Sequence, residues 1–89
     1  MIIVRESFIA KPGKASALAK MMKQAWPDSV VMTDMTGTFN TVVVQTEYDD
    51  LAGFEQELKD YQQGKGKRQP LPGYADLFSG GMREIFRIW

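Results

Sequence analysis

The sequence predicts an α+β domain in which strand, helix and strand follow one another twice. Residues 2–9 form an apolar strand segment that stops at Lys11-Pro12-Gly13-Lys14 and gives way to a helix rich in Ala, Leu and Met. The second half of the chain repeats this order of elements, and 89 residues leave room for one core. We therefore expect residues 1–89 to form a single domain of βαββαβ order, with a four-stranded antiparallel sheet and two helices on one face. The other face of the sheet would be bare.

The first helix is predicted from about Pro12 to Ala25, because proline suits the first helical turn. One apolar stripe recurs at spacings of three and four: Ala15, Leu18, Met21, Met22 and Ala25. The two methionines could line a ligand site, but methionine more often fills gaps in a core, so core packing is the favoured interpretation. Pro27 ends the helix.

The next two strands are predicted at Val30–Met32 and Phe39–Tyr48, joined near Thr36-Gly37-Thr38, where glycine can supply a positive φ. One face of the longer strand is apolar and the other is mixed, and we expect the apolar face to meet the helices. The apolar face consists of Val42, Val44 and Tyr48; the mixed face consists of Thr41, Val43, Gln45 and Glu47.

The second helix should begin at Asp49 as N-cap, with Asp50 favouring its positive end. Its apolar stripe is Leu51, Phe54, Leu58 and Tyr61. Gly53 costs about 1 kcal/mol relative to alanine inside a helix, so we interpret it as a close approach of helix and sheet. The helix should fray at Gln62-Gln63-Gly64.

Residues 65–81 are rich in Gly and Pro and are the least regular part of the chain. The segment contains four apolar or aromatic residues that indicate packing against another part of the structure: Leu71, Tyr74, Leu77 and Phe78. Either a lid over a pocket or an arm across a dimer would bury them. The closing strand is predicted at residues 82–89. Trp89 is favoured as a dimer anchor, because aromatic residues are enriched at interface cores.

Composition excludes several classes of function. Eleven basic and eleven acidic residues cancel, so the electrostatic signature of a nucleic-acid-binding protein is missing. The chain has no Cys and no His, which removes thiolate chemistry, the commonest metal ligand and the usual haem ligand; we expect no metal and no cofactor. No stretch approaches the roughly 20 apolar residues of a membrane span, and Met1-Ile2-Ile3-Val4 is too short for a signal peptide. We expect a cytoplasmic protein that does not enter the membrane.

A chain of this size buries roughly 60–65% of its surface on folding, yet 44% of its residues are hydrophobic. This surplus of apolar surface predicts a partner, most simply a second copy in a homodimer.

The order of elements resembles the ferredoxin-like topology, which several unrelated functions share. RNA-recognition domains of this topology stack bases on aromatic residues of the third strand, where this chain offers Phe39 alone. Metal chaperones of this topology need paired cysteines. Both alternatives are rejected.

A closer resemblance is to the dimeric α+β barrel superfamily, which includes NIPSNAP-like proteins, antibiotic-biosynthesis monooxygenases and stress-responsive barrel proteins. The residues that carry it are Val4-Arg5-Glu6, Lys11-Pro12-Gly13-Lys14, the hairpin into Phe39–Tyr48, and the closing run 84–89. NIPSNAP-like is the first choice of branch, on Arg5-Glu6 and the Lys-Pro-Gly turn. The resemblance implies two sheets packed face to face in a dimeric α+β barrel, and often a small aromatic ligand between sheet and helices.

Two enzymatic activities are known in the superfamily that this chain resembles. The haem-degrading branch holds iron with a helical His, which this chain lacks. The cofactor-independent monooxygenases remove a proton from a phenol or quinol, so that the anion reduces O₂, and they use Asn, Trp, Tyr and Arg groups. Residues of these types are present, but without matched motif positions their roles are not carried over: Asn40, Trp26, Tyr48, Tyr74, Arg5 and Arg83.

Five residues are the candidate ligand-binding set: Arg5, Asn40, Tyr48, Tyr74 and Glu84. Catalytic residues are left unassigned, and each candidate has a structural alternative. Arg5 could bind an anionic substrate, but a cross-strand pair with Glu47 or Glu84 is favoured. Asn40 could orient a phenolate, or could serve the local backbone of a turn. Tyr48 and Tyr61 are most simply core residues with their hydroxyls at the edge. Lys65-Gly66-Lys67-Arg68 could grip a phosphate, but a solvated loop is favoured.

Carboxylates on predicted strands are the remaining candidates: Glu6, Asp34, Glu47 and Glu84. If one points into a cavity without an arginine nearby, it becomes the leading general base. The sequence leaves open which of them, if any, does so.

Three hypotheses of function follow. The first is a small dimeric α+β-barrel protein that binds a small aromatic or polyketide-like ligand between sheet and helices. The second is a cofactor-independent monooxygenase or isomerase. The third is a non-catalytic dimerisation module, which a cavity filled by Met21, Met22, Phe54 and Leu58 would favour. Whether the chain is an enzyme at all stays open at this point.

Overall fold

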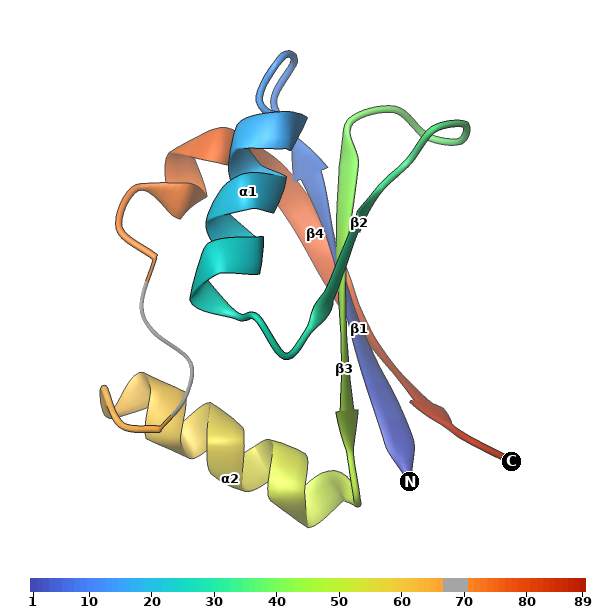
Figure 1. The fold of residues 1–89 in the computed structure, drawn as a ribbon, viewed down its shortest axis with the longest axis vertical. Coiled ribbons are helices and arrows are strands. Elements are labelled where there is room, and N and C mark those ends of the chain that lie inside the picture. Colours follow the sequence, from blue (N-terminus) through green and yellow to red (C-terminus); the bar gives the residue numbers. More distant parts are fainter. Residues whose placement is uncertain (67–70) are drawn as a thin grey trace.

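The computed structural model describes residues 1–66 and 71–89 and has the predicted order of elements (Figure 1). The elements are β1 (Ile2–Ala10), α1 (Ala15–Ala25), β2 (Val30–Thr33), β3 (Thr41–Tyr48), α2 (Leu51–Gln62), the 3₁₀ helix η1 (Tyr74–Leu77) and β4 (Phe78–Arg87). The strands form one antiparallel sheet in the order β2-β3-β1-β4. Both helices lie on the same side of it. The ferredoxin-like fold class predicted from the sequence is confirmed.

The main core lies between α1 and the sheet. Leu18 and Met22 of α1 are fully buried, as are Val42 and Val44 of β3. The core cluster is completed by Ala10, Trp26 and Leu71. The apolar stripe of the first helix and the apolar face of the third strand therefore meet as predicted, and methionine fills the core here.

The first helix begins three residues later than predicted. Gly13 has φ +76° and the Lys14 N–H donates to the Lys11 carbonyl at 2.9 Å, so residues 11–14 close a turn. A left-handed glycine cannot continue into a right-handed helix. Pro12 therefore lies in the turn, and α1 starts at Ala15.

The third strand begins at Thr41 and not at Phe39. Gly37 has the positive φ expected of it, but so do Phe39 and Asn40, at 73° and 53°. The Asp34 carboxylate holds this loop, since it accepts from the backbone N–H groups of Phe39 (2.7 Å) and Thr41 (2.9 Å). Two left-handed residues in succession are incompatible with a strand, so the ladder starts after them.

The second helix is capped by Asp50, not by Asp49. The Asp50 carboxylate accepts from the Gly53 N–H at 2.8 Å. A Cβ on Gly53 would meet only the Asp50 carboxylate, at 3.4 Å, so the interpretation of Gly53 as a close approach to the sheet is wrong. Throughout the described helix, Leu51–Gln62, no residue is fully buried, and Leu51 at the start of the predicted stripe is 59% exposed.

The segment before the last strand packs onto the core, as its apolar residues indicated. Leu71 is buried, and Tyr74, Leu77 and Phe78 pack against the main cluster. The last strand is longer at its start than predicted and ends at Arg87, so Trp89 lies beyond it, fully exposed. The predicted Lys65–Arg68 loop falls partly outside the described residues.

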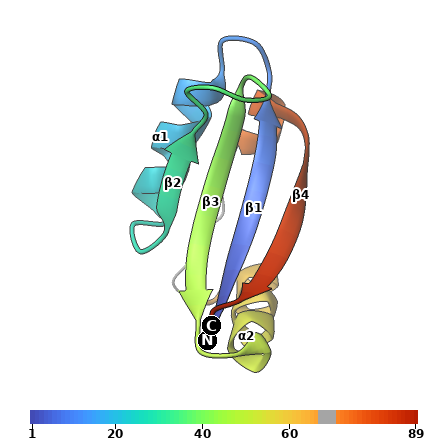
Figure 2. The ribbon, with the colours of Figure 1, turned by 90° about the vertical axis from the view of Figure 1, so that its right-hand side faces the viewer.

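The other face of the sheet is uncovered (Figure 2). Arg5 lies opposite Gln45 on one side and Glu84 on the other, so these three side chains mark the uncovered face. Strand alternation adds exposed apolar side chains from β1, β2 and β4 to that face: Ile9, Val30, Met32, Met82 and Phe86. Each is at least 38% exposed, the value of Met32. Exposed apolar patches are typical of surfaces that contact a partner.

Candidate functional site

A cavity of about 170 Å³ lies between the sheet and α2. It lies toward the α2 end of the helix-covered face and borders the main core at Trp26. Six of its ten lining residues are aromatic, and they come from five different parts of the chain. The lining is Glu6, Phe8, Trp26, Tyr48, Phe54, Glu57, Leu58, Tyr61, Tyr74 and Arg83.

An ion pair lies on the sheet side of this cavity. Glu6 of β1 and Arg83 of β4 are directly opposite each other in the ladder. Nε and Nη2 of Arg83 donate to the same oxygen of Glu6, at 3.2 and 2.9 Å. The guanidinium carbon of Arg83 also lies 5.4 Å from the ring centroid of Phe54 on α2. The pair therefore links the sheet to the second helix.

Glu6 is the strand carboxylate that points toward the helices. Its side chain is 14% exposed, whereas that of Arg83 is 43% exposed. Because an arginine lies beside it, Glu6 does not meet the condition that would make an inward carboxylate the leading general base. The remaining carboxylates of that set lie elsewhere: Asp34 in the β2–β3 loop, and Glu47 and Glu84 at positions of the uncovered face.

Aromatic contacts form the walls of the cavity. The rings of Tyr48 and Phe54 meet edge to face, with centroids 5.4 Å apart. Phe78 contacts Phe8 at 5.0 Å and Tyr74 at 5.4 Å, which ties η1 to the first strand. The Tyr48–Phe54 and Phe8–Phe78 pairs meet edge to face, whereas the Tyr74–Phe78 pair is tilted. Aromatic pairs fix ring orientation beyond what area burial alone supplies. The walls suit a flat ring.

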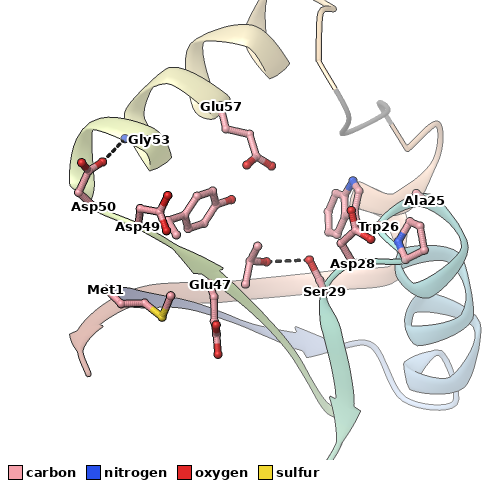
Figure 3. Close-up of a pocket in the computed structure, with 13 residues that line it drawn as sticks. Met1, Ala25, Trp26, Asp28, Ser29, Glu47, Asp49, Asp50, Gly53 and Glu57 are labelled. Carbon is pink, nitrogen blue, oxygen red and sulfur yellow. Dashed lines mark hydrogen bonds between the residues drawn. The ribbon is translucent and has the colours of Figure 1, made fainter. Parts of the chain in front are cut away.

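A larger groove of about 800 Å³ adjoins the cavity, and Trp26, Tyr48 and Glu57 line both (Figure 3). Its floor includes a hydrogen bond of 2.7 Å between the hydroxyls of Ser29 and Thr46, and Ser29 is buried. Carboxylates come from three elements: Asp28 after α1, Asp49 after β3, and Glu57 on α2. The cavity thus opens into an acidic groove.

The structure brings together two of the five candidate ligand-binding residues. Tyr48 and Tyr74 both line the cavity. Arg5 and Glu84 lie on the uncovered face of the sheet. Asn40 lies in the β2–β3 loop and lines a separate depression of about 510 Å³. Its positive φ agrees with the alternative in which Asn40 serves the backbone of the turn.

Arg5 does not make the favoured pair with Glu47 or Glu84. Its Nε donates to Gln45 Oε1 at 2.8 Å, and its guanidinium lies 5.1 Å from the centroid of Phe86. Gln45 is directly opposite on the neighbouring strand. Glu84 is directly opposite Arg5 as well, on β4, so the ladder register by itself does not select the amide over the carboxylate.

Sequence reasoning did not single out the Glu6–Arg83 pair or the contributions of Phe54 and Glu57. A signal was available for Glu6, since alternation places it between Val4 and Phe8 on the face that meets the helices. A charged residue on an apolar strand face needs a partner. The ladder register that supplies Arg83 is a tertiary property.

No family model matches the chain, and no curated protein resembles it in sequence. Several solved structures, however, resemble the chain in fold. An uncharacterised NIPSNAP domain protein from Burkholderia xenovorans superposes with a TM-score of 0.80 at 15% identity, covering 100% of this chain and 95% of that one. A NIPSNAP family protein from Agrobacterium tumefaciens gives 0.76 at 13% identity, covering 96% and 82%.

The chain shares the fold of these two NIPSNAP proteins. The resemblance predicted from Arg5-Glu6 and the Lys-Pro-Gly turn is confirmed at this level. A candidate antibiotic biosynthesis monooxygenase from Deinococcus radiodurans shares the fold at a TM-score of 0.65 and 14% identity, covering 100% of this chain and 93% of that one. This NIPSNAP-fold chain contains, in its described residues, no helix of the length and apolarity that a membrane crossing requires.

Proposed function

We propose that this NIPSNAP-fold chain binds a small aromatic or polyketide-like molecule between its sheet and α2. The observation that supports this most directly is the Glu6–Arg83 ion pair in a cavity whose lining is mostly aromatic. Ion pairs with a partly exposed partner, as Arg83 is here, contribute little to stability. A polar pair among rings is the arrangement expected of a ligand site, in which a few polar groups orient a molecule that apolar walls bury.

The cavity sets the size of the ligand. Its volume of about 170 Å³ is below the roughly 300–1,000 Å³ of pockets for drug-sized molecules. One or two fused rings would fill it, and a longer molecule would extend into the groove. Arg83 uses two of its five N–H donors on Glu6, which leaves donors for a hydroxyl or carbonyl oxygen of the ligand.

The test is calorimetric titration with 1-naphthol and 1,4-naphthoquinone. Saturable binding by the wild-type chain is expected, and Leu58→Trp should abolish it by filling the cavity. Leu51→Trp on the same helix is the matched control and should bind normally, because Leu51 is exposed and does not line the cavity. Absence of binding by the wild type, or equal binding by both variants, would contradict the proposal.

A catalytic role is the second candidate, as a cofactor-independent monooxygenase or isomerase. Tyr48 and Tyr74 in the cavity wall and the fold shared with a candidate antibiotic biosynthesis monooxygenase favour it. Oxygen uptake with 1,8-dihydroxyanthrone, compared between the wild type and Leu58→Trp, tests it. Uptake that the variant does not lower would not come from this cavity.

Homodimerisation through the uncovered sheet face is part of the proposal. The exposed apolar side chains on that face support it, as does the exposure of Trp89 near its edge. Light scattering should give a mass near twice the 10.1 kDa of one chain. Met82→Glu should produce monomers, whereas Leu51→Glu, which places the same charge on the outer part of α2, should not. A wild-type monomer in dilute solution would contradict the proposed dimeric α+β barrel.

The non-catalytic dimerisation module is less well supported. Met21 and Met22, two of the four residues that would fill the cavity in that case, belong to the core cluster around α1 and do not line the cavity. Phe54 and Leu58 form part of its wall instead of closing it.

A further inference from the structure

The charge of the groove beside the cavity is strongly one-sided. Four carboxylates border it on the helix side of the sheet, from Asp28, Asp49, Asp50 and Glu57, and its described lining contains no Lys or Arg side chain. Glu47 also borders the groove, but its side chain points to the opposite side of the sheet (Figure 3). The cations nearby are the terminal amine of Met1, at one end, and Lys23, whose ammonium donates to the carbonyl oxygens of Pro27 and Ser29. A third cation, Arg83, lines the adjoining cavity, where it is paired with Glu6. The groove is therefore negative overall.

Metal binding does not account for these carboxylates. Within the described residues, no three acidic side chains are grouped closely enough to hold a metal ion. They are spread around the groove instead, on three different elements, with Glu57 reaching toward the centre from α2 and Asp28 lying beside Trp26 (Figure 3). A dispersed ring of charge suits a large organic cation better than a bare ion.

The walls that this groove shares with the cavity have the matching chemistry. Trp26 and Tyr48 line both spaces together with Glu57. Aromatic faces attract ammonium and guanidinium groups, and the attraction is strongest where water is partly excluded. The chain already places one of its own cations in this way, since the Arg83 guanidinium lies 5.4 Å from the Phe54 centroid while it is paired with Glu6.

We infer that the ligand is an aromatic amine, with its ring in the cavity and its ammonium group in the groove beside Glu57, Asp28 and the rings of Trp26 and Tyr48. This inference rests on the proposed function, because the ring must enter the cavity first. It adds the charge of the ligand: the groove would favour a cation over a neutral molecule, and would repel an anion such as an aryl carboxylate.

Three probes with the same ring system separate this inference from the proposed function: 1-naphthylmethylamine, 1-naphthalenemethanol and 1-naphthoate. In calorimetric titrations of the wild-type chain at low salt, the amine should bind about three- to tenfold more tightly than the alcohol, as expected for one partly exposed ion pair with a cation–π contact. The carboxylate should bind most weakly. Salt should reduce the preference.

Two variants of α2 assign the preference to the groove. Glu57→Gln should lower the affinity for the amine about three- to tenfold and leave that for the alcohol nearly unchanged. Glu55→Gln is the matched control. It removes the same charge from the same helix, at an exposed residue that pairs with Lys59 outside the groove, and should leave the preference intact.

The outcomes are distinguishable. If the alcohol binds as tightly as the amine, or the carboxylate binds most tightly, the inference is overturned while ring binding stands. If Glu55→Gln lowers the amine affinity as much as Glu57→Gln, the assignment to the groove is overturned. If none of the three probes binds, the proposed function fails together with the inference.

Discussion

The two helices lie on the same face of one sheet but meet it in different ways. α1 places Leu18 and Met22 fully inside the core, against Val42 and Val44. α2, described over its whole length, buries no residue completely, and its inward side chains border a cavity and an ion pair. One helix supplies most of the packing, and the other forms the wall of the candidate site.

This difference was not visible in the apolar stripes of the two helices, which have the same three-and-four spacing. What separates them is the strand surface beneath each helix. Below α1 lie valines, which interdigitate with Leu and Met. Below α2 lie Glu6 and Arg83, whose polar ends cannot be packed as densely. The dense side-chain packing under α1 and the cavity under α2 therefore both follow from the side chains that the sheet presents to each helix.

The largest expected effect tests this contrast directly. Leu18→Ala should lower the free energy of unfolding by about 3 kcal/mol, within the range for fully buried leucines. Leu58→Ala should cost about 1 kcal/mol, because Leu58 is only partly buried and borders a space that already exists. Urea denaturation of both variants measures the difference, and equal losses would show that α2 is packed as tightly as α1.

A second comparison concerns two adjacent glycines of β4. A Cβ on Gly81 would collide with the Ser7 carbonyl group of β1, whereas a Cβ on Gly80 would meet nothing within 4 Å. Gly81→Ala should therefore destabilise the chain by about 2 kcal/mol, the cost of forcing packed backbone apart. Gly80→Ala should be close to neutral. A neutral Gly81→Ala in thermal denaturation would mean that the β1–β4 pair can separate without cost.

The ion pair should respond asymmetrically to the loss of either partner. Arg83→Met leaves the mostly buried Glu6 carboxylate without its cation and should cost about 1–2 kcal/mol. Glu6→Gln leaves a half-exposed guanidinium that water can reach, so it should cost less. The double variant should recover part of the loss of Arg83→Met. The expectation fails if Glu6→Gln proves the more destabilising of the two in urea.

The smallest effect concerns the start of α2. Asp50→Ala removes the carboxylate that accepts from the Gly53 N–H and should cost about 1 kcal/mol. Asp49→Ala, one residue earlier, should change stability by less than about 0.5 kcal/mol, as expected for a surface substitution. Hydrogen exchange of the first α2 amides should rise in the first variant alone. Equal losses of stability in the two variants would contradict the assignment of Asp50 as the only N-cap and would favour a capping role for Asp49.

The sequence by itself determined the fold class, the order of elements and the stripe that α1 buries. These depend on local periodicity and on breakers such as Pro27, which act over a few residues. Local chemistry also misled in places: Pro12 was assigned to a helix and Phe39 to a strand. In each case a left-handed residue nearby, Gly13 or Phe39 itself, decided the boundary.

Only the tertiary structure decided which functional residues meet. Glu6 and Arg83 are far apart in the chain, and the β1–β4 register makes them opposite. The same register and strand alternation put Arg5 and Glu84 on the uncovered face, away from Tyr48 and Tyr74. Side chains alternate between faces with a period of two residues, so a shift of one position in pairing would exchange these sets. Periodicity along one strand predicts a face, whereas a site between strands and helices depends on how distant segments are aligned.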